Sequence, residues 1–152
     1  MPGDLKSHGL RKFRCSEVSR VYLVTVVTNY RTRLFVDWMA GRPVVEAFRA
    51  AEHDGEVQSL CWVVMPDHIH WLMTLRAGSL SSVVGRMKSR STLWVNRQMG
   101  HEGQIWQRGF HDRALRREED LQAVARYVVN NPVRAGLVKS VREYSLWDAI
   151  WV

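Results

Sequence analysis

The sequence lacks the features of secreted, disulfide-rich and membrane-spanning proteins. It has two cysteines, Cys15 and Cys61, which form no C-x-x-C pair and are too few for a disulfide framework. Its first 19 residues carry charges throughout, without the apolar centre of a signal peptide. No apolar run approaches the roughly 18 residues that a membrane span requires. We therefore expect a protein of a reducing cytoplasm with no membrane partner.

Acidic residues are also scarce relative to basic ones. The 152 residues include 22 Lys and Arg against 15 Asp and Glu, which gives a net charge of +7. Such a surface attracts polyanions, of which nucleic acid is the commonest. Arginine dominates the basic residues, which favours bidentate contacts with phosphates and guanine edges. Charge alone leaves open a basic protein without a nucleic-acid partner.

The apolar pattern predicts an α+β fold of the ferredoxin-like βαββαβ type in a single domain. Strands are expected at 21–28, 57–64 and 68–75, and a fourth beginning near Ile105 and Trp106. Helices are expected at 37–53, 79–99 and 121–130, with Pro43 leaving open whether the first is one helix or two pieces. We expect an antiparallel sheet with helices on one face, the other face free to bind a ligand, and a tyrosine-bearing helix near the C-terminus.

The chain is expected to divide into three parts. Residues 1–20 are polar and basic and are interpreted as an arm, residues 21–137 as the domain, and residues 138–152 as a tail that packs back on it.

Two histidines alternate with Ile69 in one predicted strand. Since side chains alternate between the faces of a strand, His68 and His70 should project from the same face. Two neighbouring imidazoles form half of a divalent metal site. They could equally be core or surface residues with ordinary hydrogen bonds. Asp67 precedes the pair, but its position in the alternation points it away from both rings, so we expect it only to form the turn.

A second informative segment ends the predicted helix 121–130. Its apolar stripe should pack on the body of the protein, with Tyr127 at the edge and Asn131 one turn later on the same side. The helix would then present a phenol and an amide together. The alternatives are a tyrosine that packs its ring and wets its hydroxyl, and an Asn-Pro pair that only ends a helix.

Four blocks carry a resemblance across most of the chain. They are YLVTVVTNYR from Tyr22, VMPDHIHW from Val64, WQRGFHDR from Trp106, and ARYVVNNPVRAG from Ala125. In these blocks, their order and their spacing, the chain resembles the single-tyrosine HUH transposases of the IS200-like superfamily. It is most similar to the REP-associated tyrosine transposases of bacteria. HUH denotes two histidines around one hydrophobic residue, here His68-Ile69-His70.

The resemblance implies a metal-dependent reaction on single-stranded DNA. It implies that Tyr127 is the nucleophile and forms a 5′-phosphotyrosine intermediate. It also implies a divalent metal, Mg or Mn, held by His68, His70 and Asn131. The implied partner is a DNA hairpin from a repetitive extragenic palindrome (REP) with a flanking tetranucleotide at its foot. The basic arm is similar to the part that reads this foot. The protein would act as a monomer or homodimer.

Several cations are expected to contact the DNA. The polar face of the helix 79–99 could track a phosphate backbone, or it could simply be solvated. The expected set is Arg11, Lys12, Arg14, Arg20, Arg31, Arg33, Arg86, Lys88, Arg90, Arg108 and Arg134.

His111 is a candidate general base. A free sheet face with interleaved aromatics (Trp62, Trp71, Trp106) would suit unpaired DNA, although each tryptophan alone is better explained as core.

Three rival functions remain compatible with the sequence. One is a ferredoxin-like module that binds nucleic acid without cutting it. Another is a different HUH nuclease, a replication initiator or relaxase, although those commonly belong to larger chains. The third is a metal-dependent phosphoesterase that uses water.

Overall fold

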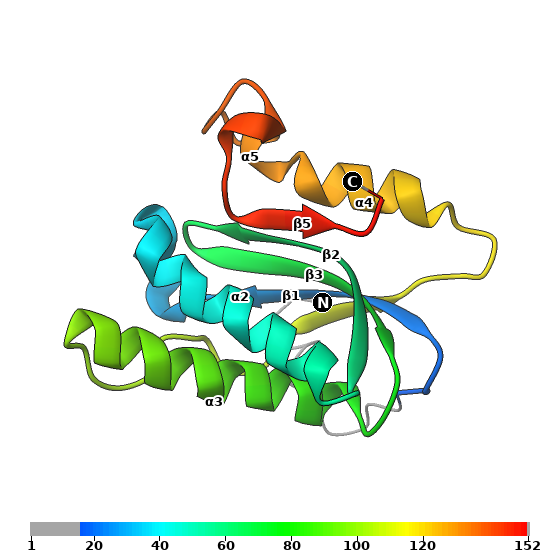
Figure 1. Ribbon diagram of the computed structural model, residues 1–152, viewed down its shortest axis with the longest axis horizontal. Coiled ribbons are helices and arrows are strands. Elements are labelled where there is room, and N and C mark those ends of the chain that lie inside the picture. The colour runs from blue at the N-terminus through cyan, green and yellow to red at the C-terminus, as the bar shows by residue number, and fades with distance from the viewer. Residues whose placement is uncertain (1–15, 152) are drawn as a thin grey trace.

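The computed structural model describes residues 16–151, which form an antiparallel five-stranded sheet in the order β4-β1-β3-β2-β5. The strands are β1 (Val21–Val27), β2 (Val57–Met65), β3 (His68–Leu75), β4 (His111–Ala114) and β5 (Trp147–Ala149). The helices are α2 (Trp38–His53), α3 (Leu80–Met99), α4 (Leu121–Val129) and α5 (Asn131–Arg134). Short 3-10 turns are η1 (Asn29–Arg31), η2 (Leu34–Val36) and η3 (Val141–Glu143). Figure 1 shows their arrangement.

The ferredoxin-like prediction is confirmed. The first four strands and the two long helices follow βαββαβ, and the strand order 4-1-3-2 belongs to that fold. Residues near the C-terminus add β5 to the outer edge of β2, with Trp147 opposite Val63. Within residues 16–151 no helix is both long and apolar enough to cross a bilayer.

Local sequence explains where the two long helices begin. Asp37 caps α2, accepting a hydrogen bond from the Met39 backbone N–H at 3.0 Å. Ser79 and Ser82 form a reciprocal capping box at the start of α3, and Gly100 ends that helix in the left-handed conformation with φ 62°. Although Pro43 lies inside α2, the helix is continuous over 16 residues rather than two pieces.

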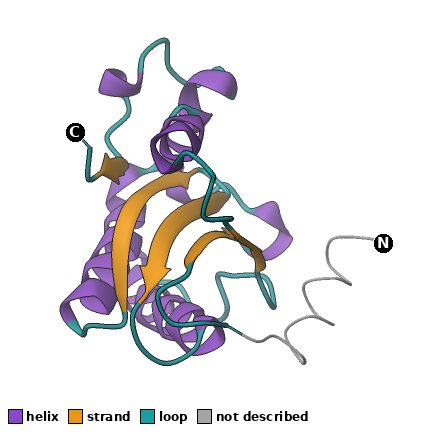
Figure 2. Ribbon diagram, turned by 90° about the vertical axis from the view of Figure 1, so that its right-hand side faces the viewer, coloured by secondary structure: helices purple, strands orange, loops and turns teal. Residues whose placement is uncertain are grey.

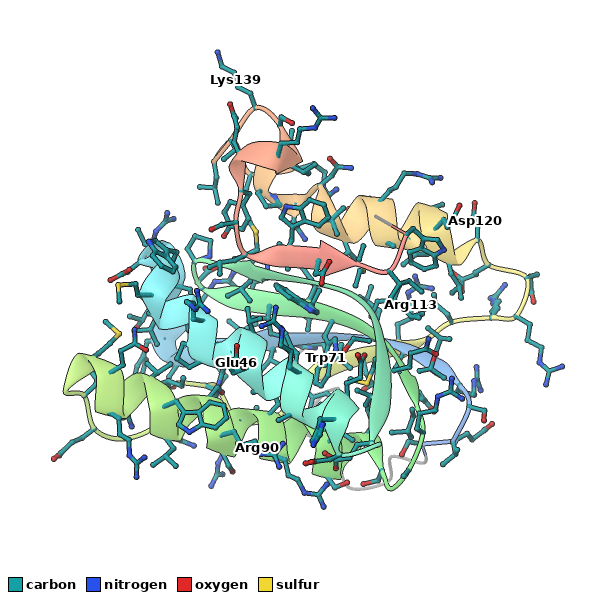
Figure 3. All side chains as sticks on the ribbon, in the orientation of Figure 1. Glu46, Trp71, Arg90, Arg113, Asp120 and Lys139 are labelled. Carbon is teal, nitrogen blue, oxygen red and sulfur yellow. The ribbon has the colours of Figure 1, made fainter. Side chains whose placement is uncertain are left out.

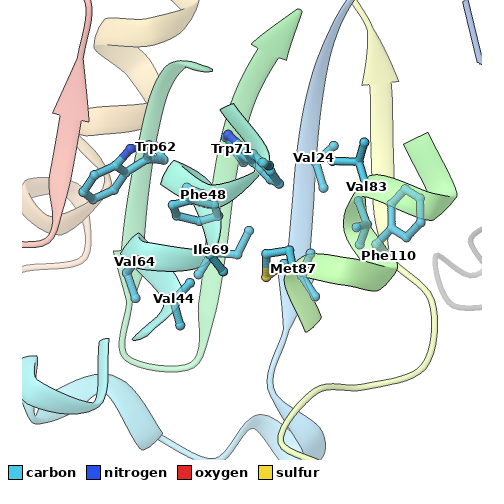
Figure 4. Packing of buried hydrophobic residues seen from close by; sticks show 14 of the residues in the cluster. Val24, Val44, Phe48, Trp62, Val64, Ile69, Trp71, Val83, Met87 and Phe110 are labelled. Atoms are coloured by element: carbon cyan, nitrogen blue, oxygen red, sulfur yellow. The ribbon is translucent and has the colours of Figure 1, made fainter. Parts of the chain in front are cut away.

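The main core lies between the sheet and the α2–α3 layer. Phe48 of α2 packs on Trp71 of β3, with ring centroids 4.6 Å apart (Figure 4). Trp71 is fully buried and donates through Nε1 to Ser59 Oγ at 2.9 Å, and Trp106 does the same to Ser91 Oγ. Trp62 is buried as well. All three tryptophans are therefore core residues and do not present their rings to unpaired DNA.

The opposite face of the sheet is covered, and the expectation of a free face was wrong. Helix α4 lies across it, on the other side from α2 and α3 (Figures 1 and 2). The α4 residues Ala125, Val128 and Val129 bury a second apolar cluster with residues such as Val63 and Leu72. The stripe of α4 therefore packs on the same face that carries the even-numbered side chains of β3.

The fourth strand begins later than predicted. Strand β4 spans His111–Ala114, while Ile105 and Trp106 lie in the preceding loop, where Trp106 makes only an isolated bridge with Thr28. Ile105 and Trp106 are adjacent and both pack into the main core, so their side chains do not alternate between two faces as those of a strand do. Their apolar character reflects loop residues that fill the core.

Candidate active site

The two predicted histidines do share a face, and it is the face on which α4 packs. His68 and His70 precede Leu72, which belongs to the α4-side cluster, while Ile69 and Trp71 point into the main core. Their ring centroids are 4.9 Å apart, and the ring planes are nearly perpendicular at 81°. Both side chains are half-buried, so the rings are held by the sheet and still reach the surface.

Asp67 orients His68, contrary to the expectation that it only forms the turn. The Nδ1 atom of His68 lies 2.7 Å from Asp67 Oδ1, and Arg31 binds the other carboxylate oxygen with Nη2 at 3.1 Å. Partial burial opposes ionisation of Asp67, but the hydrogen bonds and charges of His68 and Arg31 outweigh it and lower its pKa. Strand alternation failed here because Asp67 lies in the turn rather than in β3.

His70 is fixed in the same way by a neighbour on β1. Its Nδ1 atom lies 2.9 Å from Thr25 Oγ1. Burial, assisted by the charges of His68 and Arg134, lowers the pKa of His70 to about 4, so the ring is neutral at pH 7. Within the described residues, both histidines thus use Nδ1 for support. When Nδ1 of each ring carries the proton, Nε2 has a free lone pair.

Tyr127 lies on α4 and is 65% exposed. Arg134 of α5 folds back over it, with the guanidinium carbon 3.7 Å from the ring centroid and Nη1 2.5 Å from the Tyr127 carbonyl oxygen. The same guanidinium contributes to the lowered pKa of His70. Arg134 therefore lies against Tyr127 and within electrostatic reach of His70, which connects the tyrosine helix to the histidine pair.

Asn131 does not continue the tyrosine helix. Helix α4 ends at Val129, and Asn131 opens the separate short helix α5. Pro132 has no backbone N–H and disfavours a helical residue before it, so the hydrogen-bond ladder is interrupted there. The half-buried side chain of Asn131 makes no hydrogen bond in the part of the chain that the structure describes. Since α5 contacts β2, Asn131 remains on the α4 side of the sheet.

His111 shares a row of the sheet with His70. In the strand register Thr25 of β1 lies opposite both His70 of β3 and His111 of β4. Directly paired residues of neighbouring antiparallel strands project from the same face. His111 is therefore on the face of the histidine pair, two strands from His70, a relation that no local pattern in the sequence contains.

The predicted DNA-contacting cations fall into separate groups. Arg11, Lys12 and Arg14 lie outside the described residues. On α3, Arg86 pairs with Glu56, Arg90 pairs with Asp54 at 2.7 Å, and Lys88 donates to the carbonyls of Gln107 and Gly109. Helix α3 lies on the other side of the sheet from α4, as Arg90 and Asp120 show in Figure 3.

Arg20 contacts Glu17, and Arg33 and Arg108 are exposed. Only Arg31 and Arg134 contact residues of the candidate site in the described region.

The sequence and fold are similar to those of known transposases. A family model described as "Transposase IS200 like" matches residues 17–131. A Haemophilus influenzae protein assigned as a REP-associated tyrosine transposase is 29% identical over 141 residues, covering 82% of this chain and 76% of its own. The REP-associated tyrosine transposase of Escherichia coli is 32% identical over 88 residues, covering 55% of this chain and 48% of its own.

Two solved structures share the fold. One is a REP-associated tyrosine transposase bound to a REP hairpin, with a TM-score of 0.70 and 27% identity over 88% of this chain and 79% of the other. The second, from Deinococcus radiodurans and assigned as a transposase, has a TM-score of 0.54 and 18% identity, covering 76% of this chain and 94% of its own. At that identity the second supports the fold alone.

Proposed function

Because the chain belongs to the IS200-like transposase family, we propose that it cleaves and rejoins single-stranded DNA through a 5′-phosphotyrosine at Tyr127. Its relatives are named tyrosine transposases, and the chain is an enzyme of this kind. The observation that carries the proposal is the exposed Tyr127 on α4, the helix that packs on the sheet face of the two supported histidines. A module that only binds DNA needs neither group.

We further propose that His68, His70 and Asn131 hold a divalent ion, Mg or Mn. The fit rests on the Nδ1 contacts of both histidines, which leave Nε2 as the ring nitrogen for a ligand, and on the Asn131 amide, which has no internal partner among the described residues. Nitrogen and oxygen donors with open positions suit such an ion when the substrate supplies oxygens. Bound there, the ion would neutralise and polarise a DNA phosphate.

The chain's own residues account for the bond changes. The Tyr127 oxygen releases its proton to solvent and attacks the phosphorus, forming a Tyr–O–P bond to the 5′-phosphate of the DNA segment on the 3′ side of the cut. The P–O3′ bond breaks, and the departing oxygen takes up a proton to become a free 3′-hydroxyl. The reverse attack by another strand's 3′-hydroxyl reseals the DNA, so no nucleotide cofactor is consumed. Asp67 and Thr25 hold the histidine rings in place throughout.

The proposed substrate is a REP-like hairpin with a single-stranded flank that carries a tetranucleotide at its foot. The solved relative bound to a REP hairpin supports this choice. The basic arm of residues 1–20 is proposed to read the foot, with the protein acting as a monomer or homodimer in the bacterial cytoplasm, associated with the nucleoid.

The test is a search for the covalent intermediate. The protein is incubated with Mn and a 3′-labelled hairpin that has single-stranded flanks on both sides, and the products are separated on a denaturing gel. We expect a labelled protein–DNA adduct that EDTA prevents. Tryptic digestion should place the DNA on the peptide 127–134. Cleavage without an adduct would instead support a hydrolase that uses water, and binding without cleavage would support a binding module.

The support of His68 by Asp67 gives a milder, graded prediction. Asp67→Asn removes the charge that orients the ring, so we expect Mn affinity to fall about 10- to 100-fold, as measured by calorimetry without DNA. Asp54→Asn is the matched control, since Asp54 is also paired with an arginine but lies beside α3. Equal Mn affinity in the wild type and Asp67→Asn would contradict an orienting role for this carboxylate.

A further inference from the structure

The segment 29–39 exposes an unusual share of the protein's apolar surface. Of the eleven exposed large hydrophobic side chains among residues 16–151, four lie in this segment: Tyr30, Val36, Trp38 and Met39. Tyr30 is the most exposed of all, at 90%. Scattered apolar residues on a surface need no explanation, but a concentration in one short segment marks an interaction site.

The backbone holds the Tyr30 ring outward at a conformational cost. Tyr30 (φ 57°, ψ 20°) and Arg31 (φ 52°) are both in the left-handed region, which residues with a side chain rarely occupy. Two hydroxyls fix the turn: Thr28 Oγ1 donates to the Thr32 carbonyl at 2.8 Å, and Thr32 Oγ1 donates to the Asn29 carbonyl at 2.9 Å. Strain that the surroundings maintain, at a side chain that adds nothing to the core, points to a role in binding.

This turn is attached directly to the candidate active site. The Thr28 backbone N–H donates to the Asp67 carbonyl at 2.9 Å, and the Thr28 hydroxyl, which is shared with the Thr32 carbonyl, lies 3.0 Å from the same oxygen. Arg31, the neighbour of Tyr30, binds the Asp67 carboxylate that in turn contacts His68. A ligand group on Tyr30 would therefore lie beside the histidine pair, at the end of the sheet where β2 turns into β3.

The charges around the segment identify the kind of ligand. Arg33 and Arg42 are exposed there, and the Arg42 guanidinium lies 5.8 Å from the centre of the Trp38 ring. Exposed aromatics interleaved with arginines are how proteins bind unpaired nucleic acid, because the rings stack on bases and the cations meet phosphates. An apolar protein partner would not call for these cations.

We propose that Tyr30 is a stacking platform for an unpaired base in the flank of the DNA hairpin, next to the phosphate to be cut. The proposal rests on the proposed function for its substrate. It locates the single strand at the β2–β3 turn, away from the buried tryptophans of the sheet.

Binding to two DNAs tests the platform independently of cleavage. Affinities for a hairpin with flanks and for the same hairpin without them are measured by fluorescence anisotropy, in a Tyr127→Phe background that leaves the DNA uncut. Tyr30→Ala should weaken binding of the flanked hairpin roughly 5- to 100-fold, the loss of one stacked base, and leave the flankless hairpin unchanged. Tyr30→Phe should recover most of the loss. Leu93→Ala, an exposed apolar residue on α3, is the control.

A base analogue identifies the contact. 2-Aminopurine placed at each flank position in turn should lose fluorescence on binding at one or two positions, and Tyr30→Ala should restore it there. Equal affinity of wild type and Tyr30→Ala for the flanked hairpin would overturn the proposal. So would a wild-type dimer that Tyr30→Ala converts to monomers in sedimentation, since the surface would then bind a second copy. The two proposals can fail separately. If the protein with Tyr127 intact forms no covalent adduct, but Tyr30→Ala still weakens binding of the flanked hairpin, the stacking role of Tyr30 is supported and the tyrosine mechanism is contradicted.

Discussion

Tyr127→Phe is expected to form no covalent adduct and to bind the hairpin as tightly as the wild type. The substitution removes only the attacking oxygen, and the ring can still stack under Arg134, whose guanidinium carbon lies 3.7 Å from its centre. Loss of a nucleophile in enzymes that form covalent intermediates slows turnover by roughly 10⁴-fold or more. Single-turnover cleavage of labelled hairpin measures the rate, and anisotropy measures the affinity.

The controls for this variant separate chemistry from folding. Because Tyr127 is 65% exposed, the melting temperature of Tyr127→Phe should match that of the wild type. Tyr22→Phe removes another phenol, which lies on β1 and accepts a hydrogen bond from the Glu17 backbone N–H, and this variant should keep adduct formation. An undiminished adduct in Tyr127→Phe would assign the nucleophile to another residue and remove Tyr127 from the mechanism.

How far the site could be predicted depends on the range of the interactions that build it. The shared face of His68 and His70 follows from strand alternation alone, because that rule needs only neighbouring residues. The hydrogen bonds that support those rings could not be predicted in this way. Thr25 is 45 positions from His70 in the sequence and contacts it only because of the register of β1 and β3. The role of Tyr127 entered through the family resemblance, because a helical tyrosine at a stripe edge is usually unremarkable.

The fold shows the same division between local and distant information. Capping residues and apolar periodicity located α2 and α3 to within a residue or two. An apolar stripe shows that a helix is buried but not against which surface, so the packing of α4 on the second sheet face could not be deduced. The start of the fourth strand was predicted too early because Ile105 and Trp106 are loop residues whose apolar side chains pack into the core.

His68→Ala and His70→Ala are both expected to lose cleavage and keep hairpin binding. Each removes one proposed ligand of the divalent ion, so Mn affinity measured without DNA should fall at least as far as in Asp67→Asn, and cleavage by the order of 10²- to 10³-fold or more. Hairpin affinity should change little, because the platform at Tyr30 and the basic residues are untouched. Calorimetry with Mn, anisotropy with the hairpin and the cleavage gel report the three quantities separately.

A control variant and the relative size of two losses in Mn affinity test this prediction further. His101→Ala removes an exposed imidazole just beyond α3, so Mn affinity and cleavage should both remain at the wild-type level. The loss in His68→Ala should exceed that in Asp67→Asn, because the first removes the ligand and the second only its orientation. If both histidine variants bind Mn and cleave like the wild type, the pair is a structural feature of β3. The phenol of Tyr127 would then act without an ion at this site.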